Sequence, residues 1–382
     1  MRQIRIGIDA SNLRAGGGVT HLVELLRVAD PAVDGFSQVI VWGARATLDQ
    51  IADRSWLVKS PEAVLERGLI RRALWQRFTL SALARECKCD VLFVPGGAFA
   101  GSFRPIVTMS RNMQPFDFRE LRRHGMSLTA LRLLLLRWTQ TRSFRRADGL
   151  IFLTSYARDA VMAAVKSAAG EITIVPHGVD ERFLRPPAPQ LPLSDYSAAR
   201  PMRVLYVSIV NVYKHQWHVV EAVALLRKSG LPVMLELIGP AHPPALARLK
   251  STLERFDPDG QFVHYAGAVA RAELPTRYAN ADLCLFASSC ENMPNILLEG
   301  MASGLPIACS DRLPMPEVLG GAGVYFDPEN PQDIARALRQ LIESRELREK
   351  LANASFARVR EYSWVRCARD TFQFLSAIRT GM

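Results

Sequence analysis

Short apolar runs that do not alternate strictly with polar residues recur along this chain, and they constrain its fold more than any other feature. In the first half they read IRIGIDA, QVIVWG, DVLFVPG, PIVTMS and GLIFLTS, with amphipathic helical patterns between several of them. Strands of a parallel sheet have this composition because helices bury both of its faces. The first half is therefore predicted to be a Rossmann-like domain, residues 1–184.

The same pattern restarts after a proline-rich stretch. Five prolines lie between residues 182 and 201 with few apolar residues to pack, so a linker is expected at 185–201. Beyond it RVLYVSI, VMLELIG, FVHYAG, DLCLFAS, PIACS and GVYFDP alternate with helical patterns. The prediction is an α/β protein whose second Rossmann-like domain spans 202–363.

Two helical patterns close the chain, one from Asp333 to Arg348 and one from Trp364 to Ile378. The terminal segment, 364–382, is rich in aromatic residues. It could pack back on the first domain or cover the second, and both interpretations stay open.

Length and composition agree with a large soluble protein. A chain of 382 residues suits two domains rather than one core, and 49% hydrophobic residues in recurring runs argue against disorder. The six cysteines show no CxxC spacing and are interpreted as reduced thiols in a cytoplasmic protein. The start, MRQIRIGIDA, has a strand pattern without a signal core, and LTALRLLLLRW is too short and charged to span a bilayer.

The most informative motif for chemistry is ENMPNILLEGMASGLP, which begins at Glu291. Pro294 fits a first helical turn, which places Glu291 in the preceding loop and Glu299 inside the helix. Free N–H groups at that helix start could hold a phosphate. Two solvated acids on an amphipathic helix are the alternative, but the motif follows a buried strand, whose carboxyl end is where such sheets bind ligands.

The longer segment YANADLCLFASSCENMPNILLEGMASGLPIACSDRLPMPEVLGGAGVYFDPENP resembles the donor-site signature of glycosyltransferase family four. The resemblance is specific over residues 265–340, and VLYVSIVNVYKHQ, LELIGP and IVPHGVDERF fall in the expected order. It implies a retaining enzyme of the GT-B fold, in which two Rossmann-like domains face across a cleft. It also implies a nucleotide-sugar substrate, no separate cofactor and no metal.

The resemblance assigns roles to the motif residues. Glu299 would bind the ribose hydroxyls, and Glu291 would contact hydroxyls of the transferred sugar. The stretch between them would face the diphosphate and sugar: Asn292, Met293, Pro294 and Asn295.

Lys214 matches the family lysine that neutralises the leaving diphosphate, and stabilising that charge is the main catalytic demand. The family usually carries an arginine five or six residues earlier, where this chain has Ser208 and Ile209. Asn211, His215 or a basic residue of the first domain could compensate.

The base of the nucleotide depends on backbone near Gly239 and Val269, so UDP, GDP and ADP donors all stay open.

In the first domain, a loop of Gly16, Gly17 and Gly18 lies between the first strand and helix, where glycine lets backbone approach a ligand. The family uses this loop on the acceptor and diphosphate side. Arg111 and Asn112 occupy the place where many relatives have a histidine, and Arg111 could supply part of the missing arginine charge.

Two further patterns are interpreted as structural. Asp257 and Asp259 form a DxD sequence, but it lies between a polar helix and a strand, away from the context in which this motif binds metal. His177 is more consistent with a turn residue at the domain connection than with a general base.

The segment from Arg119 to Arg146 carries eight arginines against one acid, with leucines and Trp138 interleaved. Residues 1–180 as a whole hold 25 Lys and Arg against 16 Asp and Glu, whereas the remainder holds 23 against 21. At helical spacing the segment gives a basic and an apolar face, which favours an anionic membrane surface. A core-packed helix with a solvated basic face is the alternative, and no nucleic-acid module is recognised.

The sequence thus predicts a retaining, metal-independent glycosyltransferase on the inner face of the cytoplasmic membrane. Its acceptor would be a glycan or a lipid-linked glycan of bacterial surface or exported polysaccharide. A nucleotide-sugar epimerase of similar fold and a catalytically degenerate glycan-binding subunit are the alternatives.

Overall fold

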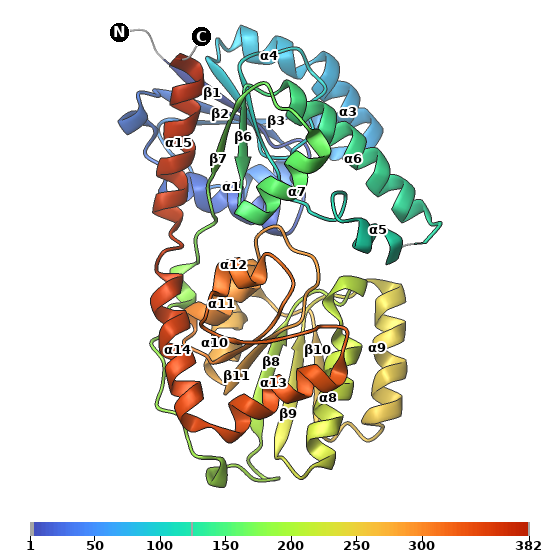
Figure 1. Ribbon diagram of the computed structural model, residues 1–382. Helices are drawn as coiled ribbons and strands as arrows, with labels where there is room; N and C mark the ends of the chain where they lie inside the picture. The colour runs from blue at the N-terminus through green and yellow to red at the C-terminus, as the bar shows by residue number, and fades with distance from the viewer. Residues whose placement is uncertain (1–3, 124, 381–382) are drawn as a thin grey trace. The chain divides into compact units, whose positions relative to one another are not determined.

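The computed structural model describes residues 4–123 and 125–380, and the chain divides into two compact units. Unit 1 contains the residues up to Gly178 together with those from Ser363 onward. Unit 2 runs from Val179 to Tyr362. Each unit is built on one wholly parallel sheet (Figure 1).

Unit 1 has a seven-stranded sheet in the order β3-β2-β1-β4-β5-β6-β7. Its strands are β1 (Arg5–Asp9), β2 (Gln38–Gly43), β3 (Leu57–Pro61), β4 (Val91–Val94), β5 (Ile106–Met109), β6 (Gly149–Phe152) and β7 (Glu171–Ile174). Its helices are α1 (Gly17–Val28), α2 (Arg45–Leu48), α3 (Leu69–Phe78), α4 (Leu80–Glu86), α5 (Phe118–Arg123), α6 (Leu128–Arg146), α7 (Ser155–Val165) and α15 (Trp364–Thr380).

The five apolar runs of the first half form the five inner strands, β2, β1, β4, β5 and β6. Three of these strands, β4, β5 and β6, are buried at every position. The outermost strands, β3 and β7, were not predicted. Both lie at sheet edges, and their sequences, LVKSP and EITI, mix polar with apolar residues, so they lack the continuous apolar run of the inner strands.

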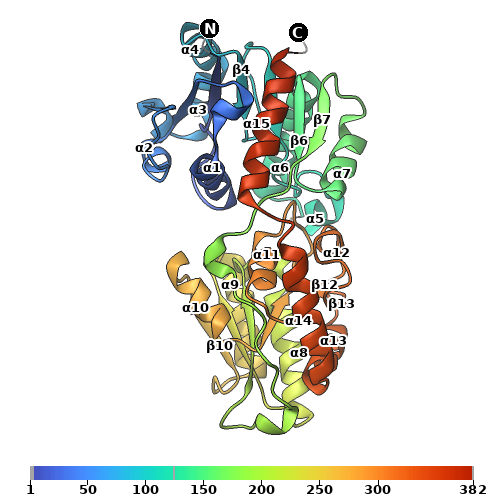
Figure 2. The same cartoon turned by 90° about the vertical axis from the view of Figure 1, so that its left-hand side faces the viewer.

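The last helix, α15, packs against α1 and against strands β4 and β6 of unit 1. Figure 2 shows it crossing one face of the sheet, while α3, α4 and α6 lie on the opposite face in Figure 1. Its Phe372 ring meets Phe36 edge-on at 6.2 Å, and Gly149 on β6 leaves room for Phe374. Gly381 and Met382, the end of the expected helix, lie outside the described residues.

Unit 2 has a six-stranded sheet in the order β10-β9-β8-β11-β12-β13. Its strands are β8 (Met202–Val207), β9 (Val233–Ile238), β10 (Val263–Gly267), β11 (Leu283–Phe286), β12 (Ile307–Ser310) and β13 (Val324–Phe326). Its helices are α8 (Gln216–Lys228), α9 (Pro243–Phe256), α10 (Leu274–Ala279), α11 (Asn295–Ala302), α12 (Met315–Leu319), α13 (Pro331–Glu343) and α14 (Arg345–Val359). All six strands coincide with the apolar runs of the second half.

The helical pattern expected from Asp333 to Arg348 is two helices in the structure, α13 and α14. They meet at Ser344, whose hydroxyl accepts a hydrogen bond from the amide of Leu347 at 3.1 Å and caps the second helix. Serine competes with continuous helix through such capping bonds, which explains the break.

The proline-rich stretch 185–201 lies within unit 2 and is held there by specific bonds. Tyr196 donates to Asp282 at 2.9 Å, and the fully buried Arg348 donates to Gln190 at 3.1 Å and to the Leu191 carbonyl. Prolines limit the backbone freedom of this stretch, while these side chains fasten it to the domain.

Replacing Arg348 by methionine should lower the free energy of unfolding by about 2–4 kcal/mol, because several carbonyls lose a charged donor. The same change should make residues 185–201 more sensitive to limited proteolysis. Chemical denaturation and protease digestion measure the two effects. Arg345→Met is the control, because Arg345 is exposed on the same helix and its pair with Glu349 lies in solvent. Equal behaviour of the two variants would contradict this role for Arg348.

Candidate active site

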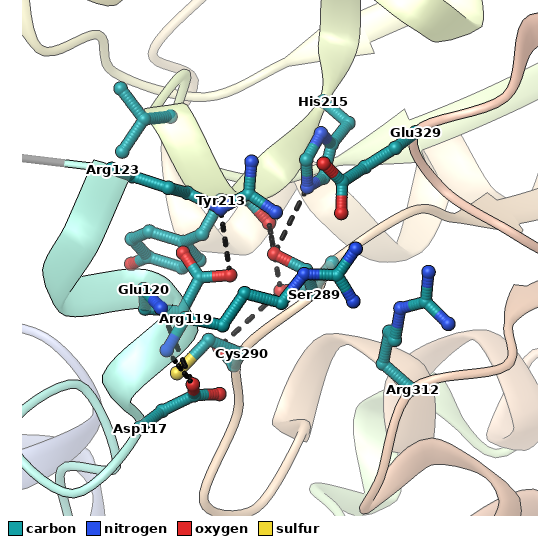
Figure 3. Close-up of polar contacts among 12 residues, drawn as sticks. Asp117, Arg119, Glu120, Arg123, Tyr213, His215, Ser289, Cys290, Arg312 and Glu329 are labelled. Carbon is teal, nitrogen blue, oxygen red and sulfur yellow. Dashed lines mark hydrogen bonds and ion pairs between the residues drawn. The ribbon is translucent and has the colours of Figure 1, made fainter.

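Two loops at the carboxyl ends of neighbouring strands build the candidate site in unit 2. Strands β8 and β11 pair in parallel, so the loops that follow them emerge at the same edge of the sheet. The amide of Ser289, after β11, donates to the Tyr213 carbonyl, after β8, at 2.8 Å. Figure 3 shows Tyr213, His215 and Ser289 meeting at this edge.

Lys214 and Glu291, the two residues expected to be catalytic, form an ion pair between these loops. The Lys214 side chain is 7% exposed and that of Glu291 is 17% exposed. The ammonium also lies about 5 Å from the centres of the Tyr213 and Phe286 rings. A buried ammonium needs a counter-charge, and Glu291 provides it here.

The backbone of Lys214 is fixed from below by the sheet. The Tyr206 hydroxyl on β8 donates to the Lys214 carbonyl at 2.8 Å. The next residue, His215, adopts a left-handed backbone with φ of 54° and lies 3.0 Å from the Ser289 hydroxyl through Nε2. This turn begins α8 and directs the Lys214 side chain toward Glu291.

No second cation stands where the family usually carries an arginine, five or six residues before Lys214. Ile209 is partly exposed, and the Asn211 side chain accepts from the amide of Val212 at 2.7 Å, as a cap of the short turn. The Ser208 hydroxyl accepts from Gln216 at 2.8 Å. Asn211 and Ser208 therefore shape the loop, and neither supplies the expected charge.

Helix α11 begins one residue later than the sequence suggested. Pro294 is the N-cap, with Asn295 as the first helical residue, so Glu291 lies in the loop and Glu299 in the helix as expected. The amide of Asn295 donates to the Met293 carbonyl at 3.0 Å, and Pro294 has no N–H. In this conformation neither residue can donate a backbone hydrogen bond to a phosphate; Asn292 and Met293 are buried beside them.

Glu299 is the buried carboxylate of the site. One of its oxygens, Oε2, is buried without a hydrogen-bond partner among the described residues. Burial raises its pKa to about 7, although the nearby Arg271 acts in the opposite direction. A carboxylate left without donors in the folded protein is suited to accept hydrogen bonds from a ligand diol.

Three charged residues near Glu299 were not predicted as site residues. Asp180 pairs with Arg182 at 2.6 Å and with Arg271 at 3.5 Å. Burial opposes ionisation of Asp180, but its bonds to Arg182 lower its pKa. Asp180 and Arg271 are 91 positions apart, so no local spacing pattern indicates this cluster.

Gly239 places backbone against the β8 loop. A Cβ there would lie 2.1 Å from the Ser208 carbonyl oxygen, and its φ of 146° also favours glycine. The Tyr265 hydroxyl donates to the Gly239 carbonyl at 2.9 Å. Val269 lies in the loop after β10 and is half-buried.

The other predicted residues lie in unit 1. Gly16 is the N-cap of α1 with φ of 69°, Gly17 begins the helix, and Gly18 lies directly against Arg111. Asn112 accepts from the amide of Gln114 at 3.1 Å. The structure thus groups Gly18 with Arg111, while Asn112 shapes its own turn.

Both patterns interpreted as structural have structural roles. The Asp257 carboxylate accepts three backbone bonds of 2.7–3.0 Å, from Gln261, Phe262 and Val263. The His177 ring stacks on His21 and on Trp364, with ring centres 4.7 and 5.4 Å away, and those two rings also lie near each other at 5.9 Å.

The arginine-rich segment forms two helices, α5 and α6, rather than one. On α6 the apolar and basic residues do not occupy opposite faces: Leu128, Leu131 and Leu135 are exposed, whereas Gln140 is buried. In α5, Arg123 pairs with Glu120 at 2.9 Å (Figure 3). Neither an amphipathic face nor a simple solvated basic face describes α6.

Within residues 4–123 and 125–380, no group of three or more His, Cys, Asp or Glu side chains is arranged to hold a metal ion. No helix of the described chain is both long and apolar enough to cross a bilayer.

Each of the two α/β units has a parallel sheet, and in the second unit side chains that could bind a ligand lie at the carboxyl ends of the strands. This architecture is that of the GT-B class. The solved structure of WaaG, a glycosyltransferase involved in lipopolysaccharide biosynthesis, has this fold with a TM-score of 0.71 at 16% identity, over 97% of this chain and 99% of WaaG. HepE from Anabaena, solved with UDP, gives 0.68 at 17% identity over 98% and 100%.

The sequence comparisons identify the family. The profile described as Glycosyltransferase Family 4 matches residues 15–183, and the one described as Glycosyl transferases group 1 matches residues 197–358. The chain belongs to glycosyltransferase family four. It is 26% identical over 234 residues to O-antigen chain mannosyltransferase B of Escherichia coli, and the match spans 60% of each chain.

Replacing Glu299 by glutamine should make the stability of the protein less dependent on pH. The folded state holds this proton up to about pH 7, whereas an unfolded glutamate releases it near pH 4.5. The contribution of Glu299 to the free energy of unfolding therefore falls as pH rises from about 4.5 to 7. Relative to wild type, Glu299→Gln should gain stability between pH 5 and pH 8, measured by denaturation at both values.

The exposed Glu254 on α9 provides the control for this measurement. Glu254→Gln should leave the pH dependence of wild type unchanged. If the difference between Glu299→Gln and wild type were the same at both pH values, the raised pKa would be wrong.

Proposed function

We propose that this protein transfers a sugar from a nucleoside-diphosphate sugar to a glycan or lipid-linked acceptor, in the synthesis of bacterial surface or exported polysaccharide. The observation that carries the proposal is the site in unit 2, where a buried lysine–glutamate pair lies at the strand ends and a second buried carboxylate lacks a partner. The relatives add support, since one is named for O-antigen chains and a structural neighbour for lipopolysaccharide.

Glu299 is proposed to bind the ribose of the donor. Its unpartnered Oε2 can accept from a ribose hydroxyl, which would satisfy an oxygen that is buried in the free protein. Val269 and Gly239 are proposed to face the base. The nearby Arg271 and Asp180 would border the nucleotide on the same side.

Lys214 is proposed to neutralise the leaving diphosphate. Negative charge develops on the phosphate as the glycosidic bond breaks, and a fixed ammonium stabilises it without metal. Glu291 holds that ammonium in the free protein and would turn to the sugar hydroxyls when phosphate takes its place. This supports a metal-independent reaction in which Asn292 and Met293 flank the sugar and phosphate.

The stereochemistry is proposed to be retaining. The departing phosphate oxygen would accept the proton of the acceptor hydroxyl, which then bonds to the anomeric carbon on the face that the diphosphate leaves. No separate base is required on that route, which suits a chain with Arg111 where relatives have histidine.

Replacing Lys214 by methionine should lower transfer by about 10²- to 10³-fold, because the leaving group loses its fixed positive charge. Glu291→Gln should also lower transfer. The assay is incubation of the protein with labelled nucleotide-sugar and a lipid-linked or glycan acceptor. Lys228→Met, on the exposed end of α8, is the control and should keep wild-type activity.

The same assay separates the alternatives. Isomerised donor without any acceptor would show a nucleotide-sugar epimerase instead. Binding of glycan or nucleotide with no turnover, and no effect of Lys214→Met in complemented cells, would show a catalytically degenerate subunit.

The acceptor side is proposed to work at the inner face of the cytoplasmic membrane, through an apolar and basic surface of unit 1. Its apolar members are exposed on two helices: Leu69, Ile70, Leu74 and Phe78 on α3, and Leu128, Leu131, Leu134, Leu135 and Trp138 on α6. Burial lowers the pKa of Arg72 on α3, and Arg14 and then Arg132 on α6 lower it further, so the two helices are neighbours.

The charge of this surface is uniform. Neither α3 nor α6 contains an acidic residue, and Arg71, Arg77, Arg132, Arg142 and Arg146 are exposed on them. Exposed apolar side chains among arginines suit the headgroup layer of an anionic bilayer, where each arginine adds about 1 kcal/mol.

The double change Leu135→Glu with Trp138→Glu should reduce binding to phosphatidylglycerol vesicles by about tenfold or more, measured by co-sedimentation. Both apolar contact and charge complementarity would be lost. Val365→Glu is the matched control, because Val365 is equally exposed on α15. Wild-type protein that bound phosphatidylcholine and phosphatidylglycerol vesicles alike, or neither, would refute the membrane proposal.

A further inference from the structure

Three arginines of unit 1 come together beside the carboxyl end of β1. Arg72, on α3, donates through Nη1 to the Ser11 carbonyl at 3.1 Å, in the loop that follows β1. Arg14, in the same loop, donates to the Leu65 carbonyl at 2.8 Å, shortly before α3. Burial lowers the pKa of Arg72, and the nearby charges of Arg14 and then of Arg132 on α6 lower it further. The three cations are therefore close enough to repel one another.

Few acids compensate this charge. Glu66 lies 4.0 Å from Arg14, but the two side chains are 43% and 42% exposed, so the pair is weak. Neither α3 nor α6 contains an acidic residue. The buried carboxylate at the end of β1, Asp9, accepts from Ser11 and Gln76, and across residues 4–123 and 125–380 no bond joins it to an arginine. Excess positive charge at the carboxyl end of a parallel strand suits an anionic ligand.

Two of the guanidiniums keep nitrogens with which to bind such a ligand. Arg72 uses Nη1 for the Ser11 carbonyl, and its Nη2 makes no hydrogen bond within the described residues. Arg132 is exposed, and in the same part of the chain it makes neither a hydrogen bond nor an ion pair. The planar fork of a guanidinium matches the oxygens of a phosphate. The cluster thus offers donors from two helices to one anion.

Exposed leucines border the arginines. Leu128 and Leu135 lie four residues before and three residues after Arg132, so they share its face of α6. Leu69 lies three residues before Arg72 and shares its face of α3. Each of these leucines is more than half exposed, and both helices lie on the same face of the sheet (Figure 1). A ligand bound here would meet positive charge and hydrocarbon side by side.

We propose that Arg14, Arg72 and Arg132 bind the phosphate group of a lipid-linked acceptor, whose hydrocarbon chain lies against the leucines of α3 and α6. This inference rests on the proposed transferase function and names both the charged group of the acceptor and the residues that hold it. A neutral glycan would leave the arginines without an anion, and a free phosphate would leave the leucines in water. An amphipathic phosphate ester satisfies both.

The position of Arg72 distinguishes this ligand from the bilayer itself. Arg71 and Arg77, on the same helix, are exposed and can meet the headgroups of a membrane surface. Arg72 is instead half-buried and bonded to the loop after β1. A single lipid phosphate that leaves the headgroup layer can reach it, whereas headgroups that stay in that layer meet the exposed arginines.

The test is isothermal titration of the full-length protein with farnesyl diphosphate. Inorganic pyrophosphate and farnesol are the comparison ligands, because each lacks one half of the proposed recognition. Dihexanoyl phosphatidylglycerol represents the bilayer headgroup, and uridine, guanosine and adenosine diphosphates report separately on the site in unit 2. The variants are Arg72→Gln and Arg132→Gln. Arg85→Gln is the control, because Arg85 is an exposed arginine of the same unit on α4.

Wild-type protein should bind farnesyl diphosphate at least about tenfold more tightly than pyrophosphate, because the chain buries apolar surface. Arg72→Gln should weaken that binding by about 10- to 100-fold, since the bonds to phosphate are charge-assisted. Arg132→Gln should weaken it by about two- to fivefold, as expected of an exposed charge. Both variants should keep the affinity for nucleoside diphosphates, and Arg85→Gln should bind every ligand as wild type does.

Three results would overturn the inference. The first is an affinity for farnesyl diphosphate that neither variant changes. The second is a loss in Arg72→Gln that comes with a lowered melting temperature while Arg132→Gln binds normally, since Arg132 makes no bond whose removal could disturb the fold. The third is dihexanoyl phosphatidylglycerol bound as tightly as farnesyl diphosphate with the same loss in Arg72→Gln, which would assign the arginines to the bilayer.

Failure of this site and failure of the transferase function give different results. Transfer to a lipid-linked acceptor with an unchanged acceptor KM in Arg72→Gln and Arg132→Gln would reject the site and keep the enzyme. Binding of farnesyl diphosphate that depends on both arginines, in a protein that transfers no sugar, would keep the site and reject the transferase.

Discussion

The ion pair between Lys214 and Glu291 is the interaction on which the site in unit 2 depends. It joins the loops after β8 and β11, and both charges are largely buried. Removing one partner of such a pair leaves an uncompensated charge, which typically costs about 3–5 kcal/mol. The surrounding bonds, from Tyr206 to the Lys214 carbonyl and from Ser289 to the Tyr213 carbonyl, hold the two loops where the pair can form.

The pair also explains why the two glutamates of one motif can have different roles. Glu291 is satisfied by a cation in the free protein, whereas Glu299, two turns of chain away inside α11, keeps an oxygen without a partner. A phosphate group that competes for Lys214 would release Glu291 to other donors, while Glu299 is available from the start. The loop before α11 thus presents a carboxylate that must exchange partners, and the helix itself presents one that only gains them.

The strands of both sheets and the placement of the two glutamates could largely be predicted from the sequence, because each depends on a short stretch of neighbouring residues. An apolar run predicted every inner strand. The order of Glu291, Pro294 and Glu299 predicted that one acid lies before the helix and one within it. The edge strands β3 and β7 were not predicted, because LVKSP and EITI mix polar with apolar residues and form no such run. Ser344 divided a helical pattern that periodicity alone could not divide.

The remaining features depend on contacts between distant positions. Arg348 fastens a stretch more than 150 residues earlier in the chain, so composition alone indicated a linker there. The cluster of Asp180 with Arg271, the pairing of Lys214 with Glu291 and the closeness of Gly18 to Arg111 have the same origin. The sequence identified most of these residues by motif, but only the fold shows which of them meet.

A crystal structure of the protein with a nucleoside diphosphate would test the central claim most directly. The account predicts that Lys214 leaves Glu291 and that its Nζ lies about 3 Å from a phosphate oxygen, with the ribose hydroxyls on Glu299. A diphosphate bound elsewhere, with the Lys214–Glu291 pair intact and Glu299 Oε2 still without a partner, would contradict it.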